Sequence, residues 1–541
     1  MASQMINRTR AWRDLASMRD GLRSNLGEMF RKDPKRSSRF MISTDQATFD
    51  FSRQLVTPPI IDGLLKLAEQ AKLKDKIQAM RAGEVINVSE HRAVLHMALR
   101  NLSGEPIMVN NVDVMPEVNS VLERIKKLSE EVLNGKRTGV TGKRFKNILA
   151  IGIGGSCLGP EYLAEACRPY AKPGMNLVFL ANVDGTDFAR KTKDLDPEET
   201  LVVVISKTFK TAETMINAET VKKWMLKSLG NNPDVIKKHF IAVSTAKEKV
   251  EEFGIDPENA FPTWSWVGGR FSATSAVGGV PLSLYLGFDN FHKILEGANA
   301  MDRHFLSAPF GKNIPVMAAL LDIWNINFMG YKMRAILPYS QALHKYAAHC
   351  QQVEMESNGK SVDIKARKVT FDTSEVVFGE PGTLGQHSFY QLMHQGTTIV
   401  PADFIGFINP QYNVGEGPLT HHDELMSNFF AQPDALAFGQ RDRFPQKVFT
   451  GNRPSNVFLL RDQDPYTAGM LLALLEHRVA VKGFIWGINS FDQFGVELGK
   501  VKGLDIRKRI ELYKKDPSNP EVFRGLNPSS AALLKVYLKK D

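Results

Sequence analysis

The sequence predicts an α/β protein with two domains, each built on a mainly parallel sheet flanked by helices. From about residue 145, short aliphatic and β-branched runs alternate with longer helical stretches, a rhythm typical of βαβ units. The same alternation returns after about residue 315. A chain of 541 residues is long enough for two or more domains, and its 43% hydrophobic content supplies ample core.

The first 120 residues are predicted to be mainly helical and to pack on the large domain. Apolar residues at helical spacing follow the paired prolines Pro58 and Pro59, which suit the start of a helix. Ser89 suits an N-cap, so a second helix is expected from there through the sequence EHRAVLHMALR. Its histidines, His91 and His96, are expected to be surface or packing residues rather than ligands.

The two α/β domains are expected over residues 121–285 and 286–510, followed by a helical tail at 511–541 that packs on the body. No low-complexity linker separates the halves, so we expect the domains to be pressed together. Strands of the first domain are expected at 147–153, 177–181, 201–205 and 240–244, with a helix at 213–229. Strands of the second domain are expected at 335–337, 369–371, 398–407, 456–460 and 481–488.

The net charge of +10 comes from basic residues that are dispersed along the chain. A positive potential attracts nucleic acid or small anionic substrates, and charge alone leaves both open. No aromatic RNA-binding signature or zinc-finger spacing occurs, so nucleic acid is not expected as a partner. No apolar run reaches the roughly 18 residues of a membrane span, and the N-terminus lacks the apolar segment of a secretory signal.

Three cysteines occur: Cys157, Cys167 and Cys350. They are too few and too scattered for a disulfide framework or a zinc site. The sequence therefore predicts a reducing, cytoplasmic setting.

A glycine-rich turn, IGIGGSCLGP at 151–160, directly follows a predicted strand. Its glycines let the backbone turn tightly and approach a ligand, and the next helix would point its N-terminal amides at an anion. A dinucleotide site competes with this interpretation. Cys157, however, occupies the third glycine position of G-x-G-x-x-G, and Asp184 is too far along the chain to be a convincing ribose ligand.

A second polar loop, SKTFKTAET at 206–214, also follows a buried strand. Ser206, Thr208 and Thr211 offer hydroxyl groups, Lys207 offers a positive charge, and the following helix adds its N-terminal amides. Hydroxyl residues at helix starts also serve as simple caps, but the lysine among them favours a phosphate cradle. The Walker A pattern is absent, so nucleotide hydrolysis is not implied.

Four further stretches carry side chains suited to catalysis. In QQVEMESNGK (351–360), Glu356 lies among amide and hydroxyl neighbours and can act as a general base. Arg270 in WVGGRFSATSAVGG suits the stabilisation of an oxyanion, and His387 in GTLGQHSFYQLMHQGT can move protons near neutral pH. In GINSFDQFGVELGK (487–500), Gln493 and Lys500 could face a polar site, although the composition alone also fits an ordinary loop and helix start. Taken singly, Glu356 also fits an ordinary helix start and Arg270 a surface ion pair.

These stretches, in this order along the chain, resemble those of the phosphoglucose isomerase family. The matching blocks reach from about residue 84 to residue 500 and include IGIGGSCLGP, SKTFKTAET, VGGRFSATSAVG, QQVEMESNGK, GQHSFYQLMHQGT and NSFDQFGVELGK. The resemblance implies two sugar-isomerase-type (SIS) domains and a homodimer whose active site lies near the subunit interface. It also implies reversible conversion of glucose 6-phosphate to fructose 6-phosphate without a cofactor or a metal.

The resemblance further implies a role for each matched residue. Glu356 would shuttle the proton between the two carbons, and Arg270 would stabilise the enediolate. His387, which the family supplies from the neighbouring subunit, and Lys500 would assist ring opening. Phosphate-binding positions of the family fall on Ser156, Ser206, Lys207, Thr208 and Thr211. Sugar-contacting positions fall on Gln352 and Gln493, and the tight backbone beside them falls on Gly155 and Gly269.

Two other classes of function stand as alternatives. A non-catalytic regulator that binds sugar phosphates would use the phosphate loop alone and would not need the four candidate catalytic groups. A nicotinamide-dependent oxidoreductase would use the glycine-rich turn, whose fingerprint is broken. The isomerase is the function that the sequence predicts.

Overall fold

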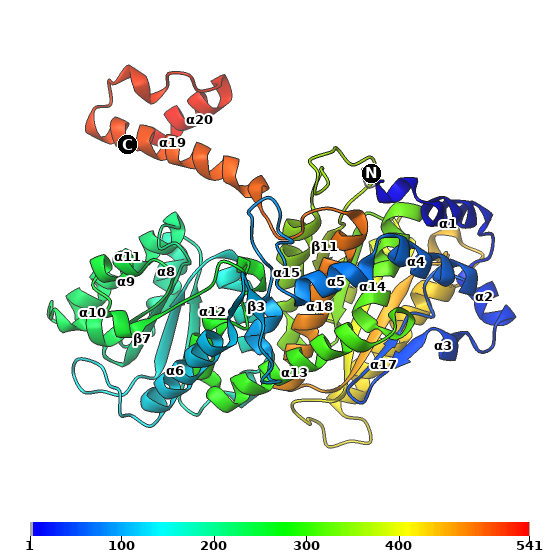
Figure 1. The fold of residues 1–541 in the computed structure, drawn as a ribbon, viewed down its shortest axis with the longest axis horizontal. Coiled ribbons are helices and arrows are strands. Elements are labelled where there is room, and N and C mark those ends of the chain that lie inside the picture. The colour runs from blue at the N-terminus through cyan, green and yellow to red at the C-terminus, as the bar shows by residue number, and fades with distance from the viewer. Residues whose placement is uncertain (1–3, 540–541) are drawn as a thin grey trace. The chain divides into compact units, whose positions relative to one another are not determined.

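The computed structural model describes residues 4–539. The chain divides into two compact units, Met1–Phe491 and Asp492–Asp541. The first unit holds two α/β sheets with their helices, and the second is helical, with α19 (Glu497–Lys515) and α20 (Pro528–Leu538) (Figure 1). The predicted α/β class and the helical tail are confirmed, although α19 runs across the predicted tail boundary at residue 511.

The first sheet has five parallel strands in the order β6-β5-β7-β8-β9. Alternate residues of each central strand enter different hydrophobic clusters, because successive side chains of a strand point to opposite faces. Helices α6 and α12 cover one face, and α9, α10 and α11 cover the other (Figure 1). The strands are β5 (Asn147–Ile151), β6 (Asn176–Leu180), β7 (Thr200–Ile205), β8 (Phe240–Val243) and β9 (Ala260–Phe261).

The helices around this sheet lie before, between and after its strands in the chain. They are α6 (Met115–Leu133), α7 (Leu158–Ala166), α8 (Gly185–Thr192), α9 (Ala212–Ser228), α10 (Asp234–His239), α11 (Lys247–Phe253) and α12 (Ala276–Leu286). The four predicted strands and the predicted helix at 213–229 are all present within a few residues of their expected bounds.

The second sheet has six strands in the order β1-β2-β13-β12-β10-β11, of which the last four are parallel. The N-terminal strands β1 and β2 complete one edge, and β2 pairs antiparallel with β13. The strands are β1 (Met41–Ser43), β2 (Ala47–Asp50), β10 (Met333–Pro338), β11 (Val376–Gly379), β12 (Ala402–Asn409) and β13 (Ser455–Asp462). The sequence interpretation missed β1 and β2, which are short.

Helices α14, α17 and α18 cover the second sheet, with α17 on the face opposite the other two. The helices of this half are α13 (Phe288–Ser307), α14 (Ile314–Ile323), α15 (Tyr346–Gln351), α16 (Tyr390–Gln395), α17 (His421–Phe438) and α18 (Pro465–Trp486). The N-terminal region adds α1 (Arg10–Gly21), α2 (Leu26–Lys32), α3 (Arg36–Arg39), α4 (Pro58–Gln70) and α5 (Leu73–Arg81), with a small hairpin of β3 (Met108–Val109) and β4 (Val112–Asp113). Helix α4 is the helix predicted after the paired prolines.

Three predicted elements are wrong. The segment after Ser89 forms a tight hairpin, in which Asn87 and Arg92 exchange backbone hydrogen bonds of 3.1 Å, followed by a 3₁₀ helix at His96–Arg100. The strand expected at 369–371 is a loop whose Phe371 packs on Trp12, and β11 forms a few residues later. The strand expected at 481–488 is the end of α18, whose residues 467–486 are all buried. A short apolar run fits a buried helix as well as a buried strand.

Candidate active site

The phosphate-loop candidates lie where the strand order of the first sheet reverses direction. Strands β5 and β7 are neighbours, with Ile151 opposite Val204, so the turn after β5 and the loop after β7 leave the same edge of the sheet. Ligands of open parallel sheets bind at such a switch point. The turn is Gly154–Ser156, and the loop runs from Ser206 to Thr211 at the start of α9.

The loop after β7 presents hydroxyl groups at different depths. Ser206 is buried and its Oγ donates to Oγ1 of Thr211 over 3.4 Å, whereas Thr208 is exposed. Thr211 occupies the N-cap position of α9, and its side chain makes no capping hydrogen bond. Its hydroxyl group is therefore not used as a cap, which removes the simple structural explanation for this threonine.

Lys207 is the partly buried cation of this loop, whereas Lys210 is exposed. Its Nζ donates to the backbone oxygen of Val267 over 3.1 Å, which ties the loop to the segment just before Arg270. Burial, and then the nearby charge of Arg92, lower the pKa of Lys207 to about 8, with Glu90 acting in the opposite direction. A lysine with a pKa of about 8 is mostly protonated at neutral pH. Its hydrogen bond goes to an uncharged backbone oxygen, which does not offset the positive charge.

The turn after β5 packs directly on the segment that carries Arg270. A Cβ atom on Gly155 would lie 2.2 Å from both the carbonyl carbon and the oxygen of Gly269, so only glycine allows this approach. A Cβ atom on Gly154 would lie 3.2 Å from Nε2 of Gln352. A Cβ atom on Gly269 itself would meet nothing within 4 Å. The steric requirement for glycine is therefore at Gly155.

Glu356 ends a π-helical turn, Gln352–Glu356, that continues α15. The Nε2 atom of Gln352 donates to its Oε2 over 3.0 Å, and Nη1 of Arg270 lies 3.5 Å from the same oxygen. The Glu356 side chain is 21% exposed and that of Arg270 is 1% exposed. A carboxylate open to the surface beside a buried cation can exchange a proton with a ligand, and π-helical turns are frequent at functional sites.

The contacts therefore bring together five of the predicted residues: Gly155, Gly269, Arg270, Gln352 and Glu356. His387 is exposed on the 3₁₀ turn Leu384–His387, and none of these contacts includes it. That turn is anchored by Gln386, whose Nε2 donates to the hydroxyl group of Tyr339 over 3.0 Å. Gln493 and Lys500 belong to the second compact unit, where Gln493 precedes a 3₁₀ turn and Lys500 is exposed on α19.

The sequence interpretation missed the buried polar groups behind Glu356. Ser357, Asn358 and Ser490 are buried and bind one another or Arg270. Glu354 forms an ion pair with Lys482 of α18, with 2.7 Å between Oε2 and Nζ. The run of polar residues after Val353 is visible in the sequence, but its direction into the core depends on the π-helical turn and could not be predicted.

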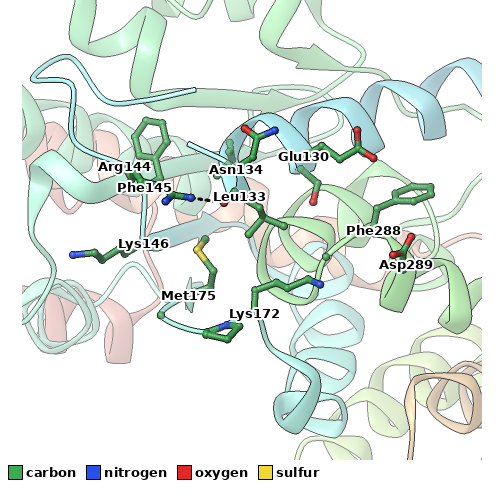
Figure 2. Close-up of a pocket in the computed structure, with 15 residues that line it drawn as sticks. Glu130, Leu133, Asn134, Arg144, Phe145, Lys146, Lys172, Met175, Phe288 and Asp289 are labelled. Atoms are coloured by element: carbon green, nitrogen blue, oxygen red, sulfur yellow. Dashed lines mark hydrogen bonds between the residues drawn. The ribbon is translucent and has the colours of Figure 1, made fainter. Parts of the chain in front are cut away.

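A pocket of about 620 Å³ lies elsewhere on the first α/β half and shares no residue with these groups. Figure 2 shows Arg144, Lys146 and Lys172 among its lining residues. Arg144 donates to the backbone oxygen of Leu133 over 2.5 Å, and Lys146 pairs with Glu199 over 2.7 Å. Two of its cations, Arg144 and Lys146, thus already bind protein groups. Because the pocket also shares no residue with the groups above, it is not the candidate active site.

Within residues 4–539, no cluster of three or more His, Cys, Asp or Glu side chains is arranged to hold a metal ion. None of the helices in this range combines the length and the apolar character that a membrane crossing requires.

Comparisons with known proteins identify the family of this chain. The sequence profile described as phosphoglucose isomerase matches residues 50–533. The cytosolic glucose-6-phosphate isomerase of Oenothera sinuata var. hirsuta is 51% identical, with 99% of this chain and 96% of that protein aligned. The cytosolic enzyme of Arabidopsis thaliana is 49% identical, with 99% and 98% aligned. The crystal structure of a glucose-6-phosphate isomerase from Chlamydia trachomatis superposes with a TM-score of 0.89 at 32% identity and covers 99% of this chain and 100% of that one.

The sequence profile, the full-length relatives and the fold agree with one another, and the chain belongs to the phosphoglucose isomerase family.

Proposed function

We propose that the protein interconverts glucose 6-phosphate and fructose 6-phosphate. The observation that carries this function is the contact of Glu356 with Gln352 and Arg270. The glycine turn, which packs on the same segment, and the phosphate loop leave adjacent strands of the first sheet. The full-length relatives are named glucose-6-phosphate isomerases, and a non-catalytic regulator is not favoured.

In this mechanism the phosphate is the anchor of the substrate. The amine of Lys207 and the hydroxyl groups of Ser156, Ser206, Thr208 and Thr211 would hold it at the edge of the first sheet. Because the phosphate is remote from the reacting carbons, its binding energy serves to position the sugar against Glu356. The basic net charge of +10 favours the approach of such an anionic substrate.

The chemistry requires one proton to move between adjacent carbons. The carboxylate of Glu356 removes the proton from C2 of the open-chain aldose, the C–H electrons form the C1–C2 double bond, and the carbonyl oxygen at C1 becomes an enediolate oxygen. The hydroxyl proton of O2 then passes to O1, and Glu356 returns its proton to C1 as O2 becomes the carbonyl oxygen, which gives the ketose. Arg270 stabilises the negative oxygen, because it is buried and preorganised beside the base.

The remaining roles are part of the same proposal. His387 and Lys500 would assist ring opening, and Gln352, Gln493, Gly155 and Gly269 would contact the sugar. We propose residues 121–285 and 286–510 as the two SIS-type domains, with the mainly helical region 1–120 packed on the larger one.

We also propose that the protein acts as a homodimer. His387 is exposed, and so are apolar side chains of its own turn, of α16 and of the loop before α17: Leu384, Leu392, Tyr412, Val414 and Leu419. A second copy that covers this surface would exclude water from the apolar groups and bring His387 to the partner's site. The curated relatives are named cytosolic, and we propose the same location; the three cysteines are free and buried.

The direct test is turnover of fructose 6-phosphate by the purified protein, measured as formation of glucose 6-phosphate. Glu356→Gln should lower kcat by on the order of a hundredfold or more, the range for loss of a general base, while substrate binding is retained. Glu123→Gln, an exposed glutamate of α6, is the matched control and should leave kcat unchanged. Turnover near the wild-type rate in Glu356→Gln would refute the assignment of the base.

A further inference from the structure

Two neutral acceptors bind the guanidinium of Arg270. Its Nε donates to Oγ of Ser357 over 2.6 Å, and its Nη2 donates to the backbone oxygen of Ser490 over 2.6 Å. These two bonds fix the plane of the group, so that Nη1 faces Glu356 at 3.5 Å. Because a hydroxyl group and a carbonyl group carry no net charge, these two acceptors orient the cation without adding a second carboxylate to Glu356.

Other buried cations near the site are bound by carboxylates. Arg334 binds the carboxylates of Glu375 and Asp403 over 2.7 and 2.6 Å. Lys482 forms ion pairs with Glu354 and Asp322 over 2.7 and 3.0 Å. Each of these cations is matched by at least two carboxylates, as expected where a buried charge has only a structural role.

Asn358 connects this charged network to the acceptors of Arg270. Its Nδ2 donates to Oε1 of Glu354 over 3.2 Å and to the backbone oxygen of Val479 over 3.1 Å. Its Oδ1 accepts from Oγ of Ser490 over 2.7 Å. Asn358 and Ser490 are buried, and a buried amide with satisfied partners has few alternative positions.

The position of Ser490 depends on a glycine of α18. A Cβ atom on Gly483 would lie 1.8 Å from Oγ of Ser490 and 3.2 Å from Oδ1 of Asn358. The hydroxyl group therefore occupies the space that a side chain at position 483 would take. The carbonyl group of Ser490 is thus placed by the buried helix α18 and by Asn358 together.

We propose that Ser357 and Ser490, the latter anchored through Asn358, are positioning residues that orient Arg270 with neutral acceptors and preserve its charge for the anionic intermediate. This inference rests on the isomerase function proposed above. In this proposal, the polar residues that follow Glu356 affect the reaction by orienting Arg270. They do not contact the sugar.

The test compares Ser357→Ala and Ser490→Ala with Ser129→Ala. Ser129 is also buried and donates to a backbone oxygen, that of Ser283, over 2.6 Å, but it lies on α6 and contacts none of the site residues. Loss of an orienting group should lower kcat about tenfold or more in Ser357→Ala, and less in Ser490→Ala, with KM nearly unchanged. Ser129→Ala should keep the wild-type kcat.

A second measurement separates positioning from general damage. Two five-carbon phosphates serve as inhibitors: a hydroxamate, which carries a planar oxyanion like the intermediate, and the corresponding alditol phosphate, which is neutral at that end. The hydroxamate should bind Ser357→Ala about tenfold more weakly, whereas the alditol phosphate should bind with wild-type affinity. An equal loss for both inhibitors, or an unchanged kcat, would overturn the proposal.

Melting curves show whether each variant is folded at the assay temperature. If Ser357→Ala is unfolded, the two inhibitors are compared in Ser490→Ala instead. Weaker binding of the hydroxamate alone would support the proposal, and an equal loss for both inhibitors would overturn it. A wild-type protein that binds both inhibitors but does not convert fructose 6-phosphate would refute the proposed function. The inhibitor ratio would still report whether Ser357 orients Arg270.

Discussion

Nη1 of Arg270 lies 3.5 Å from Oε2 of Glu356, and the arginine is almost fully buried whereas the glutamate reaches the surface. This arrangement separates two tasks between the two groups. The carboxylate can contact a substrate that arrives from solvent, and the guanidinium is held in a fixed, buried position beside it. Charge that develops between them would be stabilised without reorganisation of the protein.

Arg270→Lys should lower kcat by on the order of a hundredfold, with a small effect on KM. Lysine keeps a positive charge but cannot donate to Ser357, Ser490 and Glu356 at once from one planar group. Steady-state kinetics of the variant, with exposed Arg461→Lys as the control, measure both parameters. A rise in KM alone would mean that the arginine binds the ground state instead.

Gly155→Ala should destabilise the fold, whereas Gly269→Ala should not, although the two glycines touch each other. The new Cβ atom at position 155 would overlap the backbone of Gly269 at 2.2 Å, and the new Cβ atom at position 269 would enter open space. Overlap with backbone cannot be relieved by a rotamer change, so we expect a loss of about 3 kcal/mol in the free energy of unfolding. Urea unfolding of both variants measures it, and equal losses would contradict the geometry.

The affinity for sugar phosphates should fall as the pH rises above about 8, because Lys207 then loses its proton. Below that pH the lysine is charged, and above about pH 6 the phosphate is a dianion, so binding is tightest between these values. Arg92→Gln removes a positive neighbour, raises the pKa of Lys207 and should move the alkaline limb to higher pH. Glu90→Gln should move it to lower pH.

The dissociation constant of an alditol phosphate, measured for each variant across pH 6–10, gives the pH at which binding weakens. Identical limbs in Arg92→Gln, Glu90→Gln and the wild type would show that a group other than Lys207 titrates.

His349 should make the protein less stable in acid. It is fully buried and stacks on Tyr162, and burial lowers its pKa from 6.5 to about 4. The unfolded chain therefore binds a proton below pH 6.5 and the folded protein only below about pH 4, so stability from this group is complete above pH 6.5 and is lost as the pH falls to about 4. The loss amounts to about 3 kcal/mol.

His349→Phe keeps an aromatic ring and removes the titration. Its free energy of unfolding should therefore change less between pH 7 and pH 4 than that of the wild type. Parallel curves for the two proteins over this range would show that His349 does not contribute to acid unfolding.

Much of the first sheet could be predicted from the sequence, because each of its longer strands is a compact run of aliphatic residues between helical stretches. The loop after β7 could also be recognised as a candidate phosphate site, since hydroxyl residues and a lysine follow such a strand. Helix α18 was not predicted as a helix over its whole length. Its run of buried residues lacks an exposed polar face from which the helical period can be recognised. The edge strands β1 and β2 are too short to stand out from their surroundings.

The site was predictable only where chemistry shows in the residue type. Glu356, Arg270 and Lys207 carry charge in polar or glycine-rich stretches, and the motifs around them point to the family. Ser357, Asn358 and Ser490 are ordinary polar residues, and their contacts join positions more than 100 residues apart. Such contacts follow from the fold and not from any local pattern.

The pairing of β2 with β13 joins residues near position 50 to residues near position 457. The first sheet, in contrast, is made of strands between positions 147 and 261 and can form as soon as that part of the nascent chain leaves the ribosome. The second sheet must wait until more than 400 further residues have been synthesised after β2. During that time the N-terminal strands have no partner on that side, so late closure of this edge leaves newly made chains exposed to aggregation or to chaperone capture.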